Sequence, residues 1–265
     1  MTAPVTGLRT VARVAERELQ FFAAVWRAMA FSLFIAPFLY LVAMGIGLGG
    51  MMEDGAAGRP DLGGLPYRTF VAPGILVGTA AQFAAGSGLW PVMAGHRWLG
   101  FHRAMVNTPI APTSIPAGLL SWIFVRSSVQ AAVFLAIATA VGAIDSWWGV
   151  LAVPVAGLTG TAFAAPLMAY TASTDSDMAF DPIMRIVVAP LYLFSGAFFP
   201  LAAVPDWIAA IIRIFPLWHG IELARKATAG LDTEWPIAAN LAVLAAWTGV
   251  GWLVGRRTFT TRLGS

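Results

Sequence analysis

Apolar residues fill long stretches of the chain, with short polar breaks between them. Six such stretches lie near residues 28–48, 70–90, 117–144, 149–170, 183–200 and 236–254. Each is close to the roughly 20 residues that a helix needs to cross a bilayer. Because backbone polar groups in lipid must be satisfied within the protein, the pattern predicts helices that pack together. The expected fold is an all-α, polytopic membrane protein with six transmembrane helices.

The N-terminal residues show a different, amphipathic pattern. At 100° per residue, polar side chains gather on one helical face and apolar ones on the other. The polar face holds Arg9, Arg13, Glu16, Arg17, Gln20 and Arg27. This pattern is typical of a helix lying in the membrane interface, although a cytosolic helix packed on a partner would also show it. We therefore predict a cytoplasmic interface helix over residues 1–27 and a six-helix transmembrane domain over residues 28–265.

The fifth stretch ends irregularly. Gly196, Pro200 and Pro205 interrupt it where it should leave the bilayer. Residues 207–217 are apolar but too short to cross, and a second short helix is expected over residues 219–230. Segments of this length are typical of re-entrant structure. We expect a re-entrant helical hairpin before the sixth span.

Composition agrees with a membrane location. Hydrophobic residues make up 58% of the chain and charged residues 11%, whereas soluble domains are about 25% charged. The chain has no cysteine, which excludes disulfides, thiolate catalysis and cysteine-ligated metals.

Basic residues predict the orientation, because Lys and Arg concentrate in cytoplasmic loops. With both termini in the cytoplasm, ten basic residues lie inside and five outside. The inside set is Arg9, Arg13, Arg17, Arg27, Arg97, Arg103, Arg185, Arg256, Arg257 and Arg262; the outside set is Arg59, Arg68, Arg213, Arg225 and Lys226. We therefore expect a multi-pass plasma-membrane protein with both termini cytoplasmic.

The loop between the second and third stretches is basic and about 24 residues long, over residues 95–118. Trp98, Phe101, Met105 and Val106 recur at helical spacing and give it an apolar side. A short amphipathic helix at this place could dock a partner protein. A helix resting on lipid headgroups fits the composition equally well.

Three runs of sequence resemble the ABC-2 type exporter permeases. The run FHRAMVNTPIAPTSIPAG from Phe101 is similar to their loop before the third span, and Arg126 sits where many of them carry an arginine. The run APLYLFSGAFFP from Ala189 and the run FPLWHGIELAR from Phe215 are similar to their fifth-span signature and to the element after it. The nearest resemblance is to permeases of lipooligosaccharide (nodulation-factor) export and of daunorubicin-type drug resistance.

The resemblance implies a mechanism. Two permease copies, or two homologous permeases, would pair above two cytoplasmic ABC ATPase subunits. A coupling helix would engage the ATPase through Arg97, Trp98, Phe101, His102, Arg103 and Met105, and the interface helix would assist through Arg9, Arg13 and Arg17. The broken fifth span and hairpin would form the external gate, with Ser195, Gly196, Phe198, Phe199, Pro200, Pro216 and His219. The cargo would be an amphipathic molecule such as a drug-like compound, a lipid or a lipid-linked glycan.

The chain has no ATP-binding loop of its own. A Walker A loop places its lysine after a glycine, whereas the only lysine here, Lys226, follows Arg225. We therefore expect no catalytic residue and no cofactor in this chain, with ATP and Mg²⁺ on the partner ATPase. Nucleic acid is not an expected partner.

Arg126 lies inside the third stretch. A charge at this depth is by default a functional candidate, here a cavity charge that attracts an anionic head group. The alternative is that its side chain reaches the cytoplasmic surface or bonds a backbone carbonyl.

Two other function classes stay open. Asp175 and Asp177 form a D-x-D pattern that could hold a divalent metal in an intramembrane transferase, although no partner acid or base accompanies them. We propose no metal site. A membrane scaffold is the third class, but it would need neither a coupling loop nor a broken span.

Overall fold

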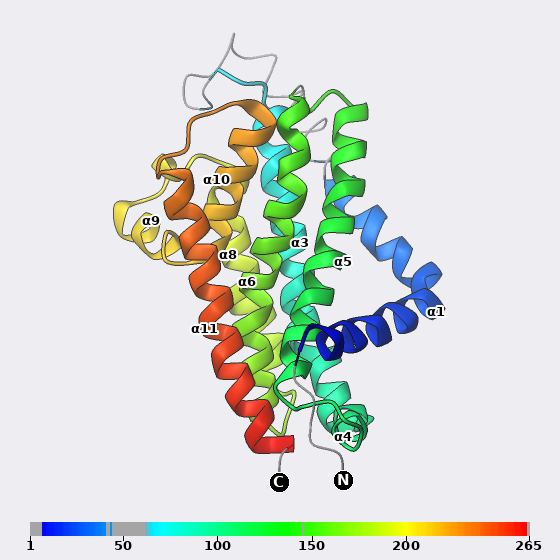
Figure 1. Cartoon of the computed structure of the whole chain (residues 1–265). Helices are drawn as coiled ribbons and strands as arrows, with labels where there is room; N and C mark the ends of the chain where they lie inside the picture. Colours follow the sequence, from blue (N-terminus) through cyan, green and yellow to red (C-terminus); the bar gives the residue numbers. More distant parts are fainter. Residues whose placement is uncertain (1–6, 41–42, 44–61, 63, 145, 264–265) are drawn as a thin grey trace.

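The computed structural model describes residues 7–40, 43, 62, 64–144 and 146–263. These residues form an all-α bundle with both termini at one end, here called the terminal end, and a far end opposite it (Figure 1). The helices are α1 (Leu8–Tyr40), α3 (Tyr67–Met93), η3 (Ala94–Trp98), α4 (Phe101–Val106), α5 (Ser114–Ala140), η4 (Trp147–Leu151), α6 (Ala152–Ser173), α7 (Phe180–Pro182), η5 (Ile183–Val188), α8 (Ala189–Tyr192), η6 (Leu193–Ala197), η7 (Leu201–Ala203), α9 (Asp206–Ile212), α10 (Pro216–Ala229) and α11 (Ile237–Leu263).

Five segments within the described ranges are long and apolar enough to cross a membrane. They are Tyr67–Trp98, Ser114–Ala140, Trp147–Ser173, Phe180–Ala197 and Ile237–Leu263, and they correspond to the second to sixth predicted spans. The pair α9 and α10 bends by 88° at its break, which makes it a broken span or a re-entrant hairpin.

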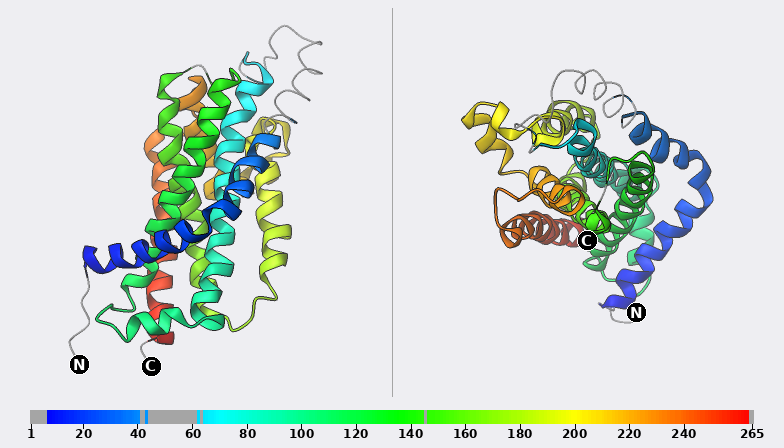
Figure 2. Two further views of the ribbon diagram at one scale, coloured as in Figure 1. Left: turned by 90° about the vertical axis from the view of Figure 1, so that its right-hand side faces the viewer. Right: turned by 90° about the horizontal axis from the view of Figure 1, so that it is seen from above.

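The interface helix and the first predicted span share one helix. α1 continues through residue 27 to Tyr40 without a break. The predicted end of the first span near residue 48 lies outside the described residues. Figure 2 shows α1 running obliquely across the outside of the bundle, next to α5.

Helix α6 is the central packing partner, because α3, α5, α10 and α11 all contact it. Glycines let these helices approach closely. A Cβ at Gly88 would lie 2.7 Å from the Ala164 carbonyl oxygen, and one at Gly251 would lie 2.6 Å from the Ala165 backbone. Lipid tails are as apolar as a protein core, so close van der Waals contact through small residues holds such helices together.

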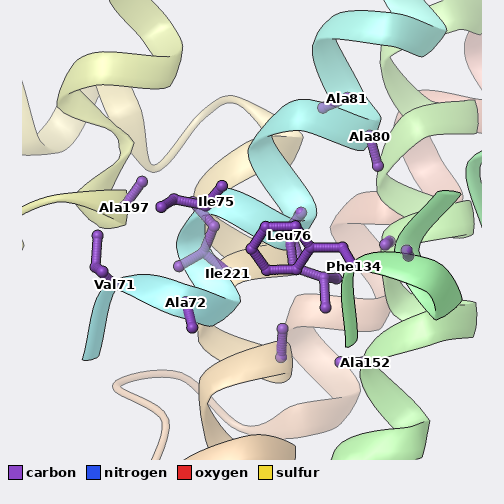
Figure 3. Close-up of a cluster of buried hydrophobic side chains, with 14 of the residues drawn as sticks. Val71, Ala72, Ile75, Leu76, Ala80, Ala81, Phe134, Ala152, Ala197 and Ile221 are labelled. Carbon is purple, nitrogen blue, oxygen red and sulfur yellow. The ribbon is translucent and has the colours of Figure 1, made fainter. Parts of the chain in front are cut away.

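The largest buried cluster joins α3 to its neighbours towards the far end. Figure 3 shows Val71, Ala72, Ile75 and Leu76 of α3 facing Phe134, Ala152, Ala197 and Ile221. Two glycines of α3 receive the broken fifth span. A Cβ at Gly78 would lie 1.9 Å from the Tyr192 ring, and one at Gly74 would lie 2.6 Å from Cα of Ala197. Gly74 and Gly78 therefore form a notch in the α3 surface, into which α8 and η6 fit.

This notch predicts the effect of Gly78→Ala. The added methyl would displace the Tyr192 ring, and overpacking of this kind costs about 1–3 kcal/mol. We expect a lower Tm in detergent, by about 2–4 °C per kcal/mol. The matched control is Gly249→Ala in α11, where a Cβ meets nothing within 4 Å and which should be neutral or stabilising. Equal Tm values for the two variants would contradict the notch.

Candidate functional site

The loop after α3 carries the predicted coupling residues at the terminal end (Figure 1). It consists of η3 and α4, which meet at Gly100. Gly100 has a φ of 66°, in the left-handed region that glycine adopts without steric cost. The chain can therefore turn sharply between the two short helices. We call residues 94–106 the coupling loop.

His102 anchors the coupling loop from inside. Its side chain is fully buried, and its ring lies 4.7 Å from Phe101 and 5.5 Å from Phe259 of α11, between ring centroids. A Cβ at Gly95 would lie 2.4 Å from its Nε2 atom, so glycine at 95 leaves room for the ring. Burial, followed by the charges of His96 and Arg17, lowers the pKa of His102 to about 3. The ring is therefore neutral in the folded protein.

The predicted coupling residues divide into two groups. Phe101, His102 and Met105 face the protein: His102 is buried, and the other two are half-buried. Arg97, Trp98 and Arg103 are exposed, with Trp98 54% exposed. Leu99 is also exposed. Trp98, Leu99 and Arg103 are thus exposed on the outside of the coupling loop, which we call its outward face.

Helix α1 holds the coupling loop against the bundle. The guanidinium of Arg17 lies 3.5 Å from the centroid of the Phe101 ring, a cation–π contact. Nearer its start, the Thr10 hydroxyl lies 3.0 Å from that of Ser114 on α5. Arg9 and Arg13 point outwards and are exposed. Of the three arginines predicted for the interface helix, Arg17 is therefore the one that touches the coupling loop.

Asp175 joins three segments at the terminal end. Its carboxylate pairs with Arg97 of η3 and, at 2.9 Å, with Arg262 of α11. Arg262 also donates to the Ser173 carbonyl at the end of α6. Desolvation opposes ionisation, but the hydrogen bonds and charges of both arginines outweigh it and hold the pKa of Asp175 below its usual value. Asp175 is therefore an ion-pair partner at neutral pH.

These ion pairs bear on the metal-dependent transferase hypothesis. Within the described ranges, no group of three or more His, Cys, Asp or Glu residues is placed to hold a metal ion. Asp177 is exposed, and Asp175 is engaged by two cations. In the part of the chain that the structure describes, neither aspartate therefore belongs to a metal-binding group.

Arg126 lies in a small pocket between α1, α3 and α5. Its guanidinium carbon lies 4.1 Å from the centroid of the Phe83 ring and 5.2 Å from the centroid of the Phe22 ring. The pocket measures about 70 Å³ and is lined in part by buried Glu18, whose carboxylate pairs with Arg17 and also attracts the Arg126 guanidinium. Helix α1 thus covers one side of Arg126.

The fifth span breaks at Gly196, in the far half of the bundle. Gly196 has a φ of 82°, which interrupts the helical hydrogen bonds. Arg225 of α10 donates a hydrogen bond of 2.7 Å to the Gly196 carbonyl. Its guanidinium also lies 4.0 Å from the Phe70 ring centroid and 3.4 Å from the Glu222 carboxylate. Arg225 is buried, so it satisfies the broken backbone where water is scarce.

The hairpin is also tied to α11. His219 of α10 lies 2.6 Å from the Asn240 side-chain oxygen and 2.8 Å from the Arg213 carbonyl. Asn240 in turn donates to the Trp235 carbonyl at 3.0 Å, and Arg213 pairs with Glu234 at 2.6 Å. The turn between α9 and α10 is therefore fixed to the start of α11.

The other predicted gate residues gather around the break. Ser195 is buried and donates to the Tyr192 carbonyl at 2.8 Å. Phe198 packs on Tyr192, and Phe199 packs on Phe194, with ring centroids 5.1 Å and 6.1 Å apart. Pro200 precedes η7, and buried Pro216 begins α10.

Sequence reasoning missed Arg225, Glu222 and Glu18. The sequence pattern assigns Arg225 only to the outside set of basic residues, and it singles out neither Glu222 nor Glu18. One signal was present for the first pair: Glu222 and Arg225 stand three residues apart on a short apolar helix, where side chains meet. The contact of Arg225 with Gly196 depends on tertiary structure and has no local signal.

The depressed pKa of His102 predicts a pH dependence of stability. In the unfolded state the imidazole has its ordinary pKa of about 6.5, so that state gains a proton first as the pH falls. Stability from the neutral ring is present above pH 6.5 and is lost below it. We expect Tm to fall between pH 7.5 and 5.5, and to fall less in His102→Phe. Phe259→Leu disturbs the same cluster without removing a titrating group, and should keep the wild-type slope; an unchanged slope in His102→Phe would contradict the assignment.

A further prediction concerns the stability contributed by Arg225. Arg225→Gln leaves the Glu222 carboxylate without its buried cation, and breaking a buried pair costs about 3–5 kcal/mol. We expect a large loss of Tm in detergent. Lys226→Gln is the matched control, because it removes the adjacent cation, whose partner Asp232 is 99% exposed. Similar small losses in both variants would show that Arg225 does not hold the break.

The chain has relatives among known proteins. The chain is 31% identical over 232 residues to Nodulation protein J of Rhizobium leguminosarum bv. viciae, which covers 86% of this chain and 85% of that protein. It is 33% identical over 199 residues to Nodulation protein J of Rhizobium leguminosarum bv. trifolii, covering 73% and 71%. For Nodulation protein J of Rhizobium meliloti (strain 1021), the identity is 30% over 195 residues, with the same coverage of 73% and 71%.

The sequence profile of the ABC-2 type transporter family matches residues 10–228, a range that begins in α1 and ends in α10. It therefore includes the coupling loop, the broken fifth span and the hairpin. The chain belongs to the ABC-2 type transporter family.

Proposed function

We propose that this chain is the permease of an ATP-driven exporter that moves an amphipathic molecule out across the plasma membrane. Two permeases would pair, and a separate ATPase would bind at the coupling loop. The observation that carries the proposal is the construction of that loop. Trp98, Leu99 and Arg103 face outwards, while the other side of the loop is fixed to the bundle.

The coupling loop is fixed by three kinds of contact. Arg17 joins it to α1, the pairs of Asp175 join it to α11, and buried His102 packs it against Phe259. A partner that pushes on the outward face would therefore move α1, α3 and α11 together. Closure of an ATPase dimer on ATP would in this way bias a rigid-body switch between two permease states.

The gate would lie at the far end, where the fifth span breaks. Arg225 links the Gly196 carbonyl to α10, and His219 links α10 to α11. In a rigid-body switch, these contacts would make the broken span and the hairpin move as one unit. The residues around Gly196 are the proposed place where the cargo path opens.

The charge distribution supports cytoplasmic termini. At the far end, Arg213, Arg225 and Lys226 pair with carboxylates, and Arg68 at the start of α3 is exposed. At the terminal end, Arg103, Arg256 and Arg257 are exposed. Such an excess of exposed positive charge is typical of the cytoplasmic side.

Arg126 has a different proposed role from the one expected from sequence. Since Phe22, Phe83 and Glu18 surround it, we assign it to seating α1 against α5 rather than to binding cargo. The cargo class therefore rests on the family, and we propose a drug-like compound, a lipid or a lipid-linked glycan.

A pull-down tests the coupling loop. The tagged chain is expressed with its ATPase and purified in mild detergent, and the bound ATPase is quantified. We expect the double variant Trp98→Ala, Arg103→Glu to lose most of the bound ATPase, at least tenfold, because it removes the exposed ring and reverses the exposed charge. Arg97 is left intact, because it pairs with Asp175.

The control is Arg257→Glu, which makes the same charge reversal on exposed α11 at the terminal end. It should keep the ATPase bound. Wild-type binding by the double variant, with normal membrane insertion, would refute docking at this loop.

A further inference from the structure

A lateral groove opens between α6, α10 and α11 near the far end. It has a volume of about 580 Å³. Its lining residues include Trp148 and Leu151 of η4, Pro154, Val155 and Leu158 of α6, Leu223, Lys226 and Ala227 of α10, and Ile237 and Leu241 of α11. Nearly all of these side chains are apolar, so the groove suits a hydrocarbon chain.

The depth of the groove matches one leaflet. Its lining on η4 and α6 runs from Trp148 to Leu158, a rise of about 15 Å at 1.5 Å per residue. The hydrocarbon core of a bilayer is about 30 Å thick, so the groove extends through half of it. Trp147 and Trp148 stand at its far-end edge, 72% and 53% exposed. Exposed tryptophans at a span end mark the headgroup level, which places the mouth of the groove there.

One charge stands at that mouth. Lys226 is the only charged residue among those lining the groove, and its ammonium lies 2.8 Å from the Asp232 carboxylate. Asp232 is 99% exposed, so this partner sits in solvent and can be replaced by another anion at modest cost. A cation at headgroup level above an apolar groove is complementary to a phosphate that carries acyl chains.

We propose that this groove is a binding site for one glycerophospholipid of the surrounding bilayer, with an acyl chain along α6 and its phosphate at Lys226. The site needs neither the ATPase nor cargo. Only its assignment to the outer leaflet rests on the orientation proposed above. The lipid would fill the space beside α10, the helix whose Arg225 holds the break in the fifth span.

The single lysine of the chain gives a direct test. The delipidated protein is treated with an amine-reactive reagent, and the modification of Lys226 is followed by peptide mass spectrometry. We expect dioleoyl phosphatidylglycerol in mixed micelles to slow the modification at least fivefold. Dioleoylglycerol, with the same chains and no phosphate, should leave the rate unchanged. Asp232→Asn removes the competing anion and should give protection at lower lipid concentration.

Native mass spectrometry provides the second measurement. The wild-type chain should retain one phosphatidylglycerol, and both Lys226→Gln and the groove-filling Leu241→Trp should lose it, while Gly249→Ala outside the groove keeps it. Three outcomes would overturn the proposal. Lys226 could be protected by dioleoylglycerol alone, or by neither lipid. Its protection could instead rise with protein concentration, as expected if a second copy of the chain covered the groove. Failure here would leave ATPase binding in the pull-down unaffected, so the two proposals fail separately.

Discussion

Close contact between helix backbones is the constraint on which the rest of the structure depends. In lipid, burying one apolar helix against another gains little from the hydrophobic effect, so the bundle is held by surface fit. Helix α6 meets four other helices, and glycines at positions 88, 157, 160, 220 and 251 remove the atoms that would keep them apart. The same device receives the irregular fifth span, since Gly74 and Gly78 leave space for Ala197 and Tyr192. An α3 surface without these glycines could not pack closely against the interrupted fifth span and hold it in one position.

A broken helix also leaves polar backbone groups, and these set the chemistry of the far end. The Gly196 carbonyl takes its hydrogen bond from Arg225, and the Arg213 carbonyl takes one from His219. Both donors sit on α10, and both are backed by further side chains, Glu222 and Asn240. Irregular backbone at membrane depth is tolerated when protein groups surround it. The hairpin thus supplies the polar partners that lipid cannot, which explains why the break and the hairpin occur together.

Much of this architecture could be predicted from sequence, because membrane spans are long apolar runs with a known length. The second to sixth spans correspond to described helices, and the break expected at Gly196 is present as a left-handed glycine. The sequence could locate the coupling loop, but it could not tell which of the loop's residues are buried and which are exposed. Its helical spacing placed His102 beside Arg103, and only the packing of Phe259 and Gly95 shows that one is buried and the other exposed. The contact of Arg225 with Gly196 and the proximity of Glu18 to Arg126 could not be predicted, because each joins two helices that are far apart in the chain.

The shared carboxylate of Asp175 makes Arg97 and Arg262 depend on each other. The guanidinium groups of Arg97 and Arg262 would repel each other if the Asp175 carboxylate were absent. The carboxylate therefore attracts each guanidinium and also allows the two to lie close together. Loss of the Asp175 carboxylate would remove two ion pairs and leave two guanidinium groups that repel each other. Loss of either arginine would leave one ion pair between Asp175 and the other arginine. Replacing the aspartate while both arginines remain is therefore less favourable than replacing an arginine first, which favours one order of change among these three positions. A short loop between two spans thus constrains how the coupling loop and the last turn of α11 can evolve.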